Sequence, residues 1–173
     1  MSYTEKQIQQ LLTNDFCIKK THDIAVPNIT TVHGFWESDL LSMTKSGLLH
    51  EFEIKTTRSD WAKEKRAIEG LSEDSHCKVR RCTALNKQLN EKVDMGTSPN
   101  YFWLCAPSGI VREEEIPPYS GLIEVYEFRK RVRIRIKKNA PRLHTGKASD
   151  KVMLSMMRSM NYKFWNSKRK WYD

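Results

Sequence analysis

Two short segments separated by a glycine-containing turn constrain the fold of this chain more than any other feature. Residues 35–43 read FWESDLLSM, residues 48–56 read LLHEFEIKT, and the four residues between them, 44–47, read TKSG. Strand-forming runs joined by a tight turn with glycine are typical of a β-hairpin. We therefore expect two antiparallel strands here, and the rest of the chain must pack around them.

The hairpin also predicts a cluster of charged side chains. Alternate side chains of a strand share a face, so Glu51, Glu53 and Lys55 project to one side, and Glu37 and Asp39 of the partner strand lie beside them. Carboxylates this close repel one another unless a cation lies among them. Oxygen ligands of this kind suit Mg²⁺ or Mn²⁺, so the pattern predicts a divalent metal site. Glu51 itself is expected to be a solvated strand residue.

The charge of the chain indicates what such a site would act on. Lysine and arginine number 30 against 21 aspartate and glutamate, a net charge of +9, which favours polyanions and nucleic acid above all. Solubility or an anionic membrane surface would also fit a basic chain. A phosphodiester suits the predicted site, because a metal polarises a phosphate oxygen and activates water while the Lys55 ammonium steadies the developing charge.

The remaining segments predict an α/β domain, with a central mixed sheet of about four or five strands flanked by helices. Expected helices cover residues 4–15, 60–70 and 149–165, and expected strands cover 101–106, 121–128 and 131–137. Residues 22–33 are expected to be extended or looped. The charged stretch 71–100 is expected to form a surface helix and loops.

Length and hydropathy predict a single cytoplasmic domain. The chain has 173 residues, enough for one hydrophobic core, and its apolar runs are far shorter than the roughly 20 residues that cross a bilayer. The N-terminus lacks the pattern of a secretory signal. Four irregularly spaced cysteines favour free thiols; His76, Cys77 and Cys82 are an alternative zinc-ligand set that lacks a second closely spaced pair.

Asp39, followed after the hairpin by Glu53-Ile54-Lys55, resembles the metal-binding core of the PD-(D/E)xK, or restriction-endonuclease-like, superfamily. Residues 37–61, 99–111 and 116–126 look like its MmcB-like and phage-encoded branch, which is linked to DNA repair and resolvase-like nucleases. The resemblance covers about residues 26–126 and implies a restriction-endonuclease-like core. Ser38 stands where the superfamily usually has proline, and residues 71–98 look like a charged insertion.

The resemblance also implies roles for individual residues. Asp39 and Glu53 would hold the metal, Ile54 would offer its backbone carbonyl to it, Lys55 would be the catalytic lysine, and Glu37 is a weaker addition to the site. A surface strand pair with cross-strand ion pairs is the alternative interpretation of the same residues.

Candidate DNA contacts lie outside this cluster. Arg58 and Lys63, near the start of the helix after the hairpin, would either reach a phosphate or simply solvate an exposed face. The strand at residues 131–137 alternates apolar and basic positions, and its basic face would follow a DNA backbone or protect a sheet edge. These basic residues are Arg131, Arg133, Arg135 and Lys137. The aromatic run Tyr101–Trp103 is expected to pack in the core, and His33 to be a loop histidine.

Together these features predict a Mg²⁺-dependent endonuclease or structure-selective DNase, in repair, recombination or phage DNA processing. Its expected setting is the cytoplasm of a bacterial or phage-infected cell, with a basic C-terminal tail from Ser167 onward. A homodimer would suit the cutting of two strands. Two alternatives stay open: an inactive nuclease-fold accessory that only binds DNA, and a phage-type inhibitor that binds a host protein.

Overall fold

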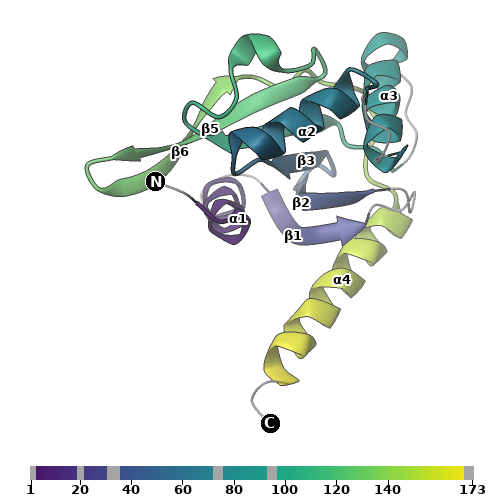
Figure 1. The fold of residues 1–173 in the computed structure, drawn as a ribbon. Helices are drawn as coiled ribbons and strands as arrows, with labels where there is room; N and C mark the ends of the chain where they lie inside the picture. The colour runs from purple at the N-terminus through teal and green to yellow at the C-terminus, as the bar shows by residue number, and fades with distance from the viewer. Residues whose placement is uncertain (1–2, 19–21, 31–35, 72–75, 93–96, 170–173) are drawn as a thin grey trace.

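The computed structural model describes residues 3–18, 22–30, 36–71, 76–92 and 97–169 (Figure 1). His33 and residues 170–173 of the expected tail lie outside these ranges. The elements, in chain order, are α1 (Glu5–Thr13), a π-helical turn (Asn14–Ile18), β1 (His22–Thr30), β2 (Glu37–Thr44), β3 (Leu49–Ile54), α2 (Arg58–Ile68), α3 (His76–Glu91), β4 (Tyr101–Pro107), a 3-10 turn (Glu113–Glu115), β5 (Ser120–Phe128), β6 (Arg131–Lys138) and α4 (Asp150–Arg169).

The strands form one mixed sheet in the order β1 to β6, which confirms the predicted α/β class. β3, β4 and β5 run parallel, and the other neighbouring pairs are antiparallel. The sheet has six strands rather than four or five, because residues 22–30 also pair with β2. Pro27 and Asn28 are uncommon in strands, so the sequence pattern did not predict β1. Proline is tolerated there because β1 lies at a sheet edge.

Helix α1 covers one face of the sheet. It begins at the predicted cap Thr4, whose side chain accepts the backbone N–H of Gln7. Its residues Ile8 and Leu12 are fully buried against a layer that includes Phe52 and Ile54 of β3. Trp103 and Cys105 of β4 belong to the same layer, so the aromatic run packs in the core as expected.

Helices α2 and α3 cover the opposite face (Figure 1). Trp61 of α2 and Leu85 of α3 pack with Phe102 and Leu104 of β4 in one buried cluster. Thr57 caps α2 by accepting the backbone N–H of Asp60. Although α3 lies within the stretch expected to form a surface helix and loops, it buries four residues, namely Arg81, Cys82, Leu85 and Gln88.

Only the first half of helix α4 packs against the core. Val152 and Met156 pack against β1, β2 and β3, but Met160 and Phe164, expected on the same face, are 40% and 53% exposed. The second half of α4 extends away from the sheet, and Lys163 Nζ in it donates to the backbone carbonyl of Asn28 in β1 at 3.2 Å (Figure 1). Ser167–Arg169 of the expected basic tail belong to this helix. Within the described ranges, no helix is long and apolar enough to span a membrane.

Strands β5 and β6 form a hairpin that projects from one end of the sheet (Figure 1). Its two turn residues, Arg129 and Lys130, both have positive φ angles of 50° and 61°. Two consecutive positive φ angles are typical of the tight turn whose twist matches that of the flanking strands. The expected strand is therefore present, but Val132 and Ile136 of its apolar face are 36% and 43% exposed, so this part of the hairpin is less covered than predicted.

Candidate active site

The carboxylates of Asp39 and Glu53 come from neighbouring strands of the predicted hairpin. Leu40 of β2 pairs with Phe52 of β3, so the next position along the strands brings Asp39 toward Glu53. Asp39 Oδ2 accepts the backbone N–H of Ile54 at 2.6 Å, and this hydrogen bond fixes the carboxylate at the end of β3. The structure therefore brings the two predicted metal ligands to one place.

These side chains line an open cleft of about 340 Å³ at the end of β2 and β3. All five residues predicted for the site contribute to its wall: Glu37, Asp39, Glu53, Ile54 and Lys55. The other lining residues come from the three neighbouring helices and from the segment before β2, and are Glu5, Trp36, Asp60, Cys77, Lys78 and Arg81. Acidic and basic groups thus meet in one concave site that a substrate can enter.

Lys55 is buried between two carboxylates. Its Nζ donates to Glu53 Oε1 at 2.6 Å and lies 3.0 Å from Glu64 Oε2, which belongs to α2. Burial alone would lower the pKa of Lys55, but the two carboxylates outweigh burial and hold that pKa above its ordinary value. Lys55 is therefore a fixed ammonium ion, suited to stabilise negative charge and unsuited to accept a proton.

Arg81, which was not predicted for the site, completes this network from α3. The fully buried guanidinium donates through Nη1 to Glu53 Oε2 and through Nη2 to Glu64 Oε1. Lys78, one turn earlier in α3, lies 3.2 Å from Glu64 Oε2. These cations hold the pKa of Glu64 well below its usual range although burial opposes them. Glu64 thus remains an anion that positions Lys55 and Arg81 beside Glu53.

Asp39 titrates near neutral pH. Burial, and then the nearby charge of Glu53, raise the pKa of Asp39 to about 7, although the N–H of Ile54 and the charge of Lys55 act in the opposite direction. A carboxyl group with this pKa is about half ionised at neutral pH, and a further positive charge nearby favours its ionised form. A cleft-bound cation would supply that charge.

Glu51 is buried, so the prediction that it is solvated is wrong. Its side chain has no solvent exposure, because Arg81 of α3 covers this face of β3 with Nη1 3.9 Å from Glu51 Oε1. Burial raises the pKa of Glu51 to about 7, and the charge of Arg81 opposes this increase. Ser38 and Trp36 are side-chain donors to this carboxylate, and both act to lower the pKa of Glu51. The cleft therefore has a further carboxyl group behind its surface.

The donor set suits a hard divalent cation with few protein ligands. In the described ranges, no three His, Cys, Asp or Glu side chains are grouped at positions that could hold a metal, so His76, Cys77 and Cys82 form no zinc site there. Five carboxylates line the cleft, those of Glu5, Glu37, Asp39, Glu53 and Asp60, and Asp39 and Glu53 lie at neighbouring positions of β2 and β3. Mg²⁺ typically uses one or two carboxylates and completes its shell with water and substrate phosphate oxygens. Two carboxylates therefore fit Mg²⁺ or Mn²⁺.

Arg58 and Lys63 of α2 differ in how free they are. Arg58 donates to both carboxylate oxygens of Glu115, at 2.5 and 2.6 Å, and to the carbonyl of Ile110. Its guanidinium therefore anchors the segment between β4 and β5. Lys63 is exposed, and no acidic partner of it occurs among the described side chains.

The four basic residues of β6 lie on an edge strand of the sheet. Arg135 is held by Glu124 of β5, with Nη2 and Oε2 2.5 Å apart, and its guanidinium lies over the Tyr126 ring. Arg133 lies over the Phe128 ring instead. Arg131 and Lys137 are exposed, so the strand presents several cations to solvent.

Comparisons with known proteins extend the fold evidence but give no function. No family model matches the chain, and no curated protein matches it. One solved structure, a protein of unknown function from Silicibacter pomeroyi, is similar with a TM-score of 0.55 and 11% sequence identity over 100% of this chain and 94% of that chain. At this identity, the likeness shows that the arrangement of elements is shared and nothing about activity.

Proposed function

We propose that the chain is a divalent-metal-dependent nuclease that hydrolyses phosphodiester bonds in DNA. The observation that carries this proposal is the cleft in which Asp39, Glu53 and Lys55 meet. The succession of a helix, three antiparallel strands, helices and a strand parallel to β3 is compatible with a restriction-endonuclease-like core. The net charge of +9 is compatible with a polyanionic substrate.

Each residue of the cleft has a distinct task in this proposal. Asp39 and Glu53 would hold Mg²⁺ or Mn²⁺, with the Ile54 carbonyl as a further ligand, and the bound ion would polarise the phosphate and activate water. Lys55 supplies a fixed positive charge next to the scissile phosphate. Glu64 and Arg81 position Lys55 and Glu53 without needing to touch the substrate.

The proposal is tested by removing one carboxylate at a time. We expect the purified chain to cleave branched, single-stranded or linear DNA in Mg²⁺ or Mn²⁺, and Asp39→Asn to lower the rate at least roughly 100-fold, because charge stabilisation at the phosphate is lost. The asparagine can still accept the N–H of Ile54, so the fold is kept. Asp23→Asn, an exposed position on β1, is the matched control and should cleave normally.

Two outcomes would contradict the proposal: no cleavage of any DNA, or equal cleavage by the Asp39 and Asp23 variants. Titration of Mn²⁺ into the protein, followed by paramagnetic resonance, separates failure of metal binding from failure of catalysis. The wild-type chain should bind the ion and Asp39→Asn should bind it more weakly.

An inactive DNA-binding accessory protein is the second candidate, and one observation favours it. Lys55 and Arg81 each donate a hydrogen bond to one carboxylate oxygen of Glu53, so both oxygens already have a cationic partner. Binding of DNA without metal and without cleavage would support this candidate, and salt should weaken that binding steeply.

A further inference from the structure

The β5–β6 hairpin continues the part of the sheet that carries the cleft. Ile54 at the end of β3 is in register with Cys105 of β4, which is in register with Ile123 of β5. Since these strands are parallel, their C-terminal ends lie at one end of the sheet. β5 runs five residues beyond Ile123 to Phe128, which corresponds to about 17 Å of extended chain past the level of Ile54.

The hairpin also presents side chains on the same sheet face as the cleft. Glu53 is in register with Leu104, and Leu104 with Leu122, so these three side chains share a face. Alternation along β5 places Tyr126 and Phe128 on that face as well. The contacts agree, because the Arg133 guanidinium lies 5.6 Å from the Phe128 ring centroid and that of Arg135 lies 4.8 Å from Tyr126.

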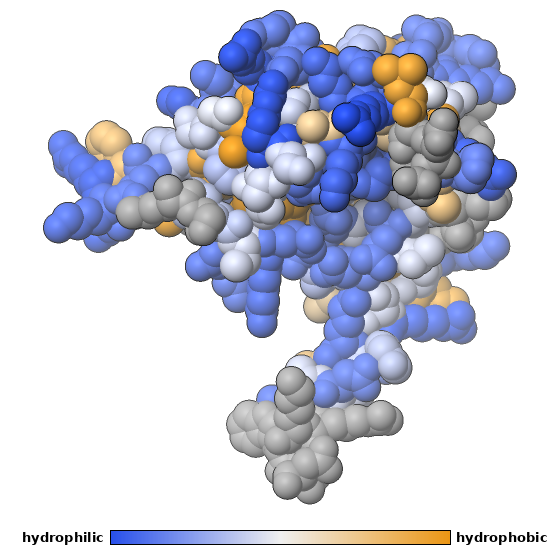
Figure 2. Space-filling model, viewed as in Figure 1, coloured by the Kyte–Doolittle hydropathy of each residue, from blue (hydrophilic) through white to orange (hydrophobic). Residues whose placement is uncertain are grey.

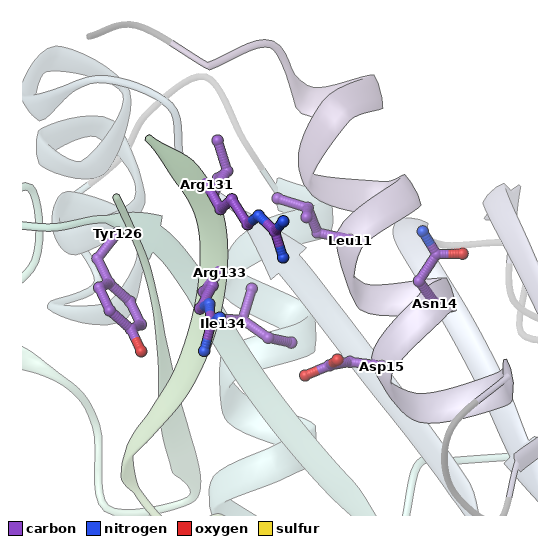
Figure 3. Close-up of a pocket in the computed structure, with 8 residues that line it drawn as sticks. Leu11, Asn14, Asp15, Tyr126, Arg131, Arg133 and Ile134 are labelled. Carbon is purple, nitrogen blue, oxygen red and sulfur yellow. The ribbon is translucent and has the colours of Figure 1, made fainter. Parts of the chain in front are cut away.

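Cations occur along one face of the hairpin and at its tip. Figure 3 shows Arg131 beside a groove of about 470 Å³ between β6 and Leu11 of α1, which Tyr126 and Arg133 also line. Arg129 and Lys130 form the exposed turn. Among the described side chains, Arg129, Lys130, Arg131 and Arg133 have no acidic partner at ion-pair distance. Hydrophilic residues cover most of the projecting hairpin in Figure 2.

We propose that this hairpin, residues 124–135, is a DNA-binding arm that enters the major groove of duplex DNA beside the cleft. The inference rests on the proposed nuclease function and names the element that holds its substrate. A two-stranded ribbon fits the roughly 12 Å width of the B-DNA major groove. The cations along one face of the ribbon and at its turn would reach the phosphates that border that groove. The deep, narrow major groove of RNA duplexes excludes such a ribbon.

The sheet geometry predicts how far the arm acts from the cut. Arg133 pairs with Tyr126, three residues past the level of Ile54, so it lies about 10 Å further along the strands. Three strand spacings separate β3 from β6, which adds about 14 Å sideways. The resulting offset of about 17 Å corresponds to roughly five base pairs, or half a helical turn.

The test measures DNA binding without metal, in an Asp39→Asn background that keeps the substrate intact. The arm variant is Arg131→Gln/Arg133→Gln, and the charge-matched control is Lys45→Gln/Lys147→Gln. Both control lysines are exposed, and they lie at the β2–β3 turn, at the opposite end of the sheet. Equal thermal stability of the two variants would establish that both are folded.

We expect the arm variant to bind a duplex of about two helical turns roughly 10-fold more weakly than the control. The slope of log affinity against log salt should fall by about 2 for the loss of two phosphate contacts. Methylation of guanine N7, which lies in the major groove, should interfere with binding about five base pairs from the cut. Single-stranded DNA and duplex RNA should show no difference between the variants.

The arm proposal is contradicted if the wild-type chain does not bind duplex DNA, or if the arm and control variants bind it equally. It is also contradicted if the arm variant loses the same affinity for single-stranded DNA and duplex RNA. Interference confined to the minor groove would also overturn it. These results are separate from the nuclease test. If cleavage requires Asp39 but the arm variant binds DNA as well as the control, only the arm proposal is contradicted. If binding depends on the arm but no DNA is cleaved, only the nuclease proposal is contradicted.

Discussion

The cleft and the hairpin arm contain the same kinds of charged side chain in opposite surroundings. In the cleft, the guanidinium of Arg81 is almost fully buried and contacts Glu53 and Glu64, which are buried as well. In the arm, the side chain of Arg135 is 50% exposed where it meets Glu124. Water and salt screen the second pair but hardly reach the first.

Because of this difference in exposure, different conditions control the charge of the two regions. In the cleft, burial and mutual coupling raise the pKa values of Asp39 and Glu51 to about 7 and keep Lys55 protonated, so pH determines the charge there. In the arm, the cations remain in solvent, so ionic strength determines their effect. A region that performs chemistry and a region that holds a polyanion are expected to differ in this way.

The largest expected effect is the loss of Arg81. Arg81→Met removes one cation from a network in which Glu53, Glu64 and Glu51 all face it. These buried carboxylates are then left with Lys55 and Lys78 as the remaining cations of that network. We expect the free energy of unfolding to fall by about 3–5 kcal/mol, as measured by urea denaturation. Arg66→Met, at an exposed position on α2, is the control and should change stability by less than about 0.5 kcal/mol.

A loss below about 1 kcal/mol for Arg81→Met would contradict the comparison, because the buried and the exposed arginine would then be energetically alike. Adding Glu64→Gln to Arg81→Met should recover part of the loss, since the double variant also removes one of the buried charges that faced Arg81.

The second expected effect is a pH-dependent gain in stability for Glu51→Gln. The folded state raises the pKa of Glu51 from 4.5 to about 7, so it binds more protons than the unfolded state between these values. Stability from this group therefore falls as pH rises from about 4.5 to 7 and stays low above 7. Glutamine has no charge to bury, so Glu51→Gln should be more stable than wild type at pH 8, by about 1–3 kcal/mol.

The measurement is the difference in melting temperature between Glu51→Gln and wild type at pH 5 and at pH 8. Taking the difference also removes the contribution of His50, which has the opposite sign. Burial and His22 lower the pKa of His50 to about 3, so the contribution of His50 to the stability of the folded protein increases as pH rises. Glu37→Gln, at the exposed start of β2, is the matched control. A gain that is equal at both pH values would contradict the assigned burial.

The hairpin was predictable because its signals are local. Alternation on either side of a glycine turn predicts β2 and β3, and Gly47 has the positive φ of 82° that such a turn requires. The same alternation predicts which side chains of β3 share a face, and the contacts of Arg81 with both Glu51 and Glu53 agree. Nuclease chemistry itself stays a prediction.

The partners from α2 and α3 were not predictable in the same way. Glu64 follows Trp61 by three residues and precedes Ala67 by three, so a charge on a buried helical face was a visible signal. Arg81 gave a weaker one, because a basic residue in a highly charged stretch is usually solvated. That α3 turns Arg81 inward depends on the packing of Cys82 and Leu85 against α2 and β4, which no local pattern specifies.

The smallest expected effect is the loss of the exposed ion pair in the arm. Arg135→Gln removes the contact with Glu124 and the position over the Tyr126 ring, 4.8 Å from its centroid. Because solvent screens both interactions, we expect the free energy of unfolding to fall by less than about 1 kcal/mol at low salt. In roughly 1 M salt, where the Debye length is about 3 Å, the loss should shrink further.

A double-mutant cycle with Glu124→Gln isolates the pair from the ring contact, which Glu124→Gln leaves in place. The coupling between Arg135 and Glu124 should be well below the coupling between Arg81 and Glu64 and should depend on salt, whereas the buried coupling should hardly change. If the coupling in the arm proved as large and as insensitive to salt as that in the cleft, exposure would not be what separates the two regions. The cations of the arm would then stabilise the fold through ion pairs and would not be available to bind a polyanion.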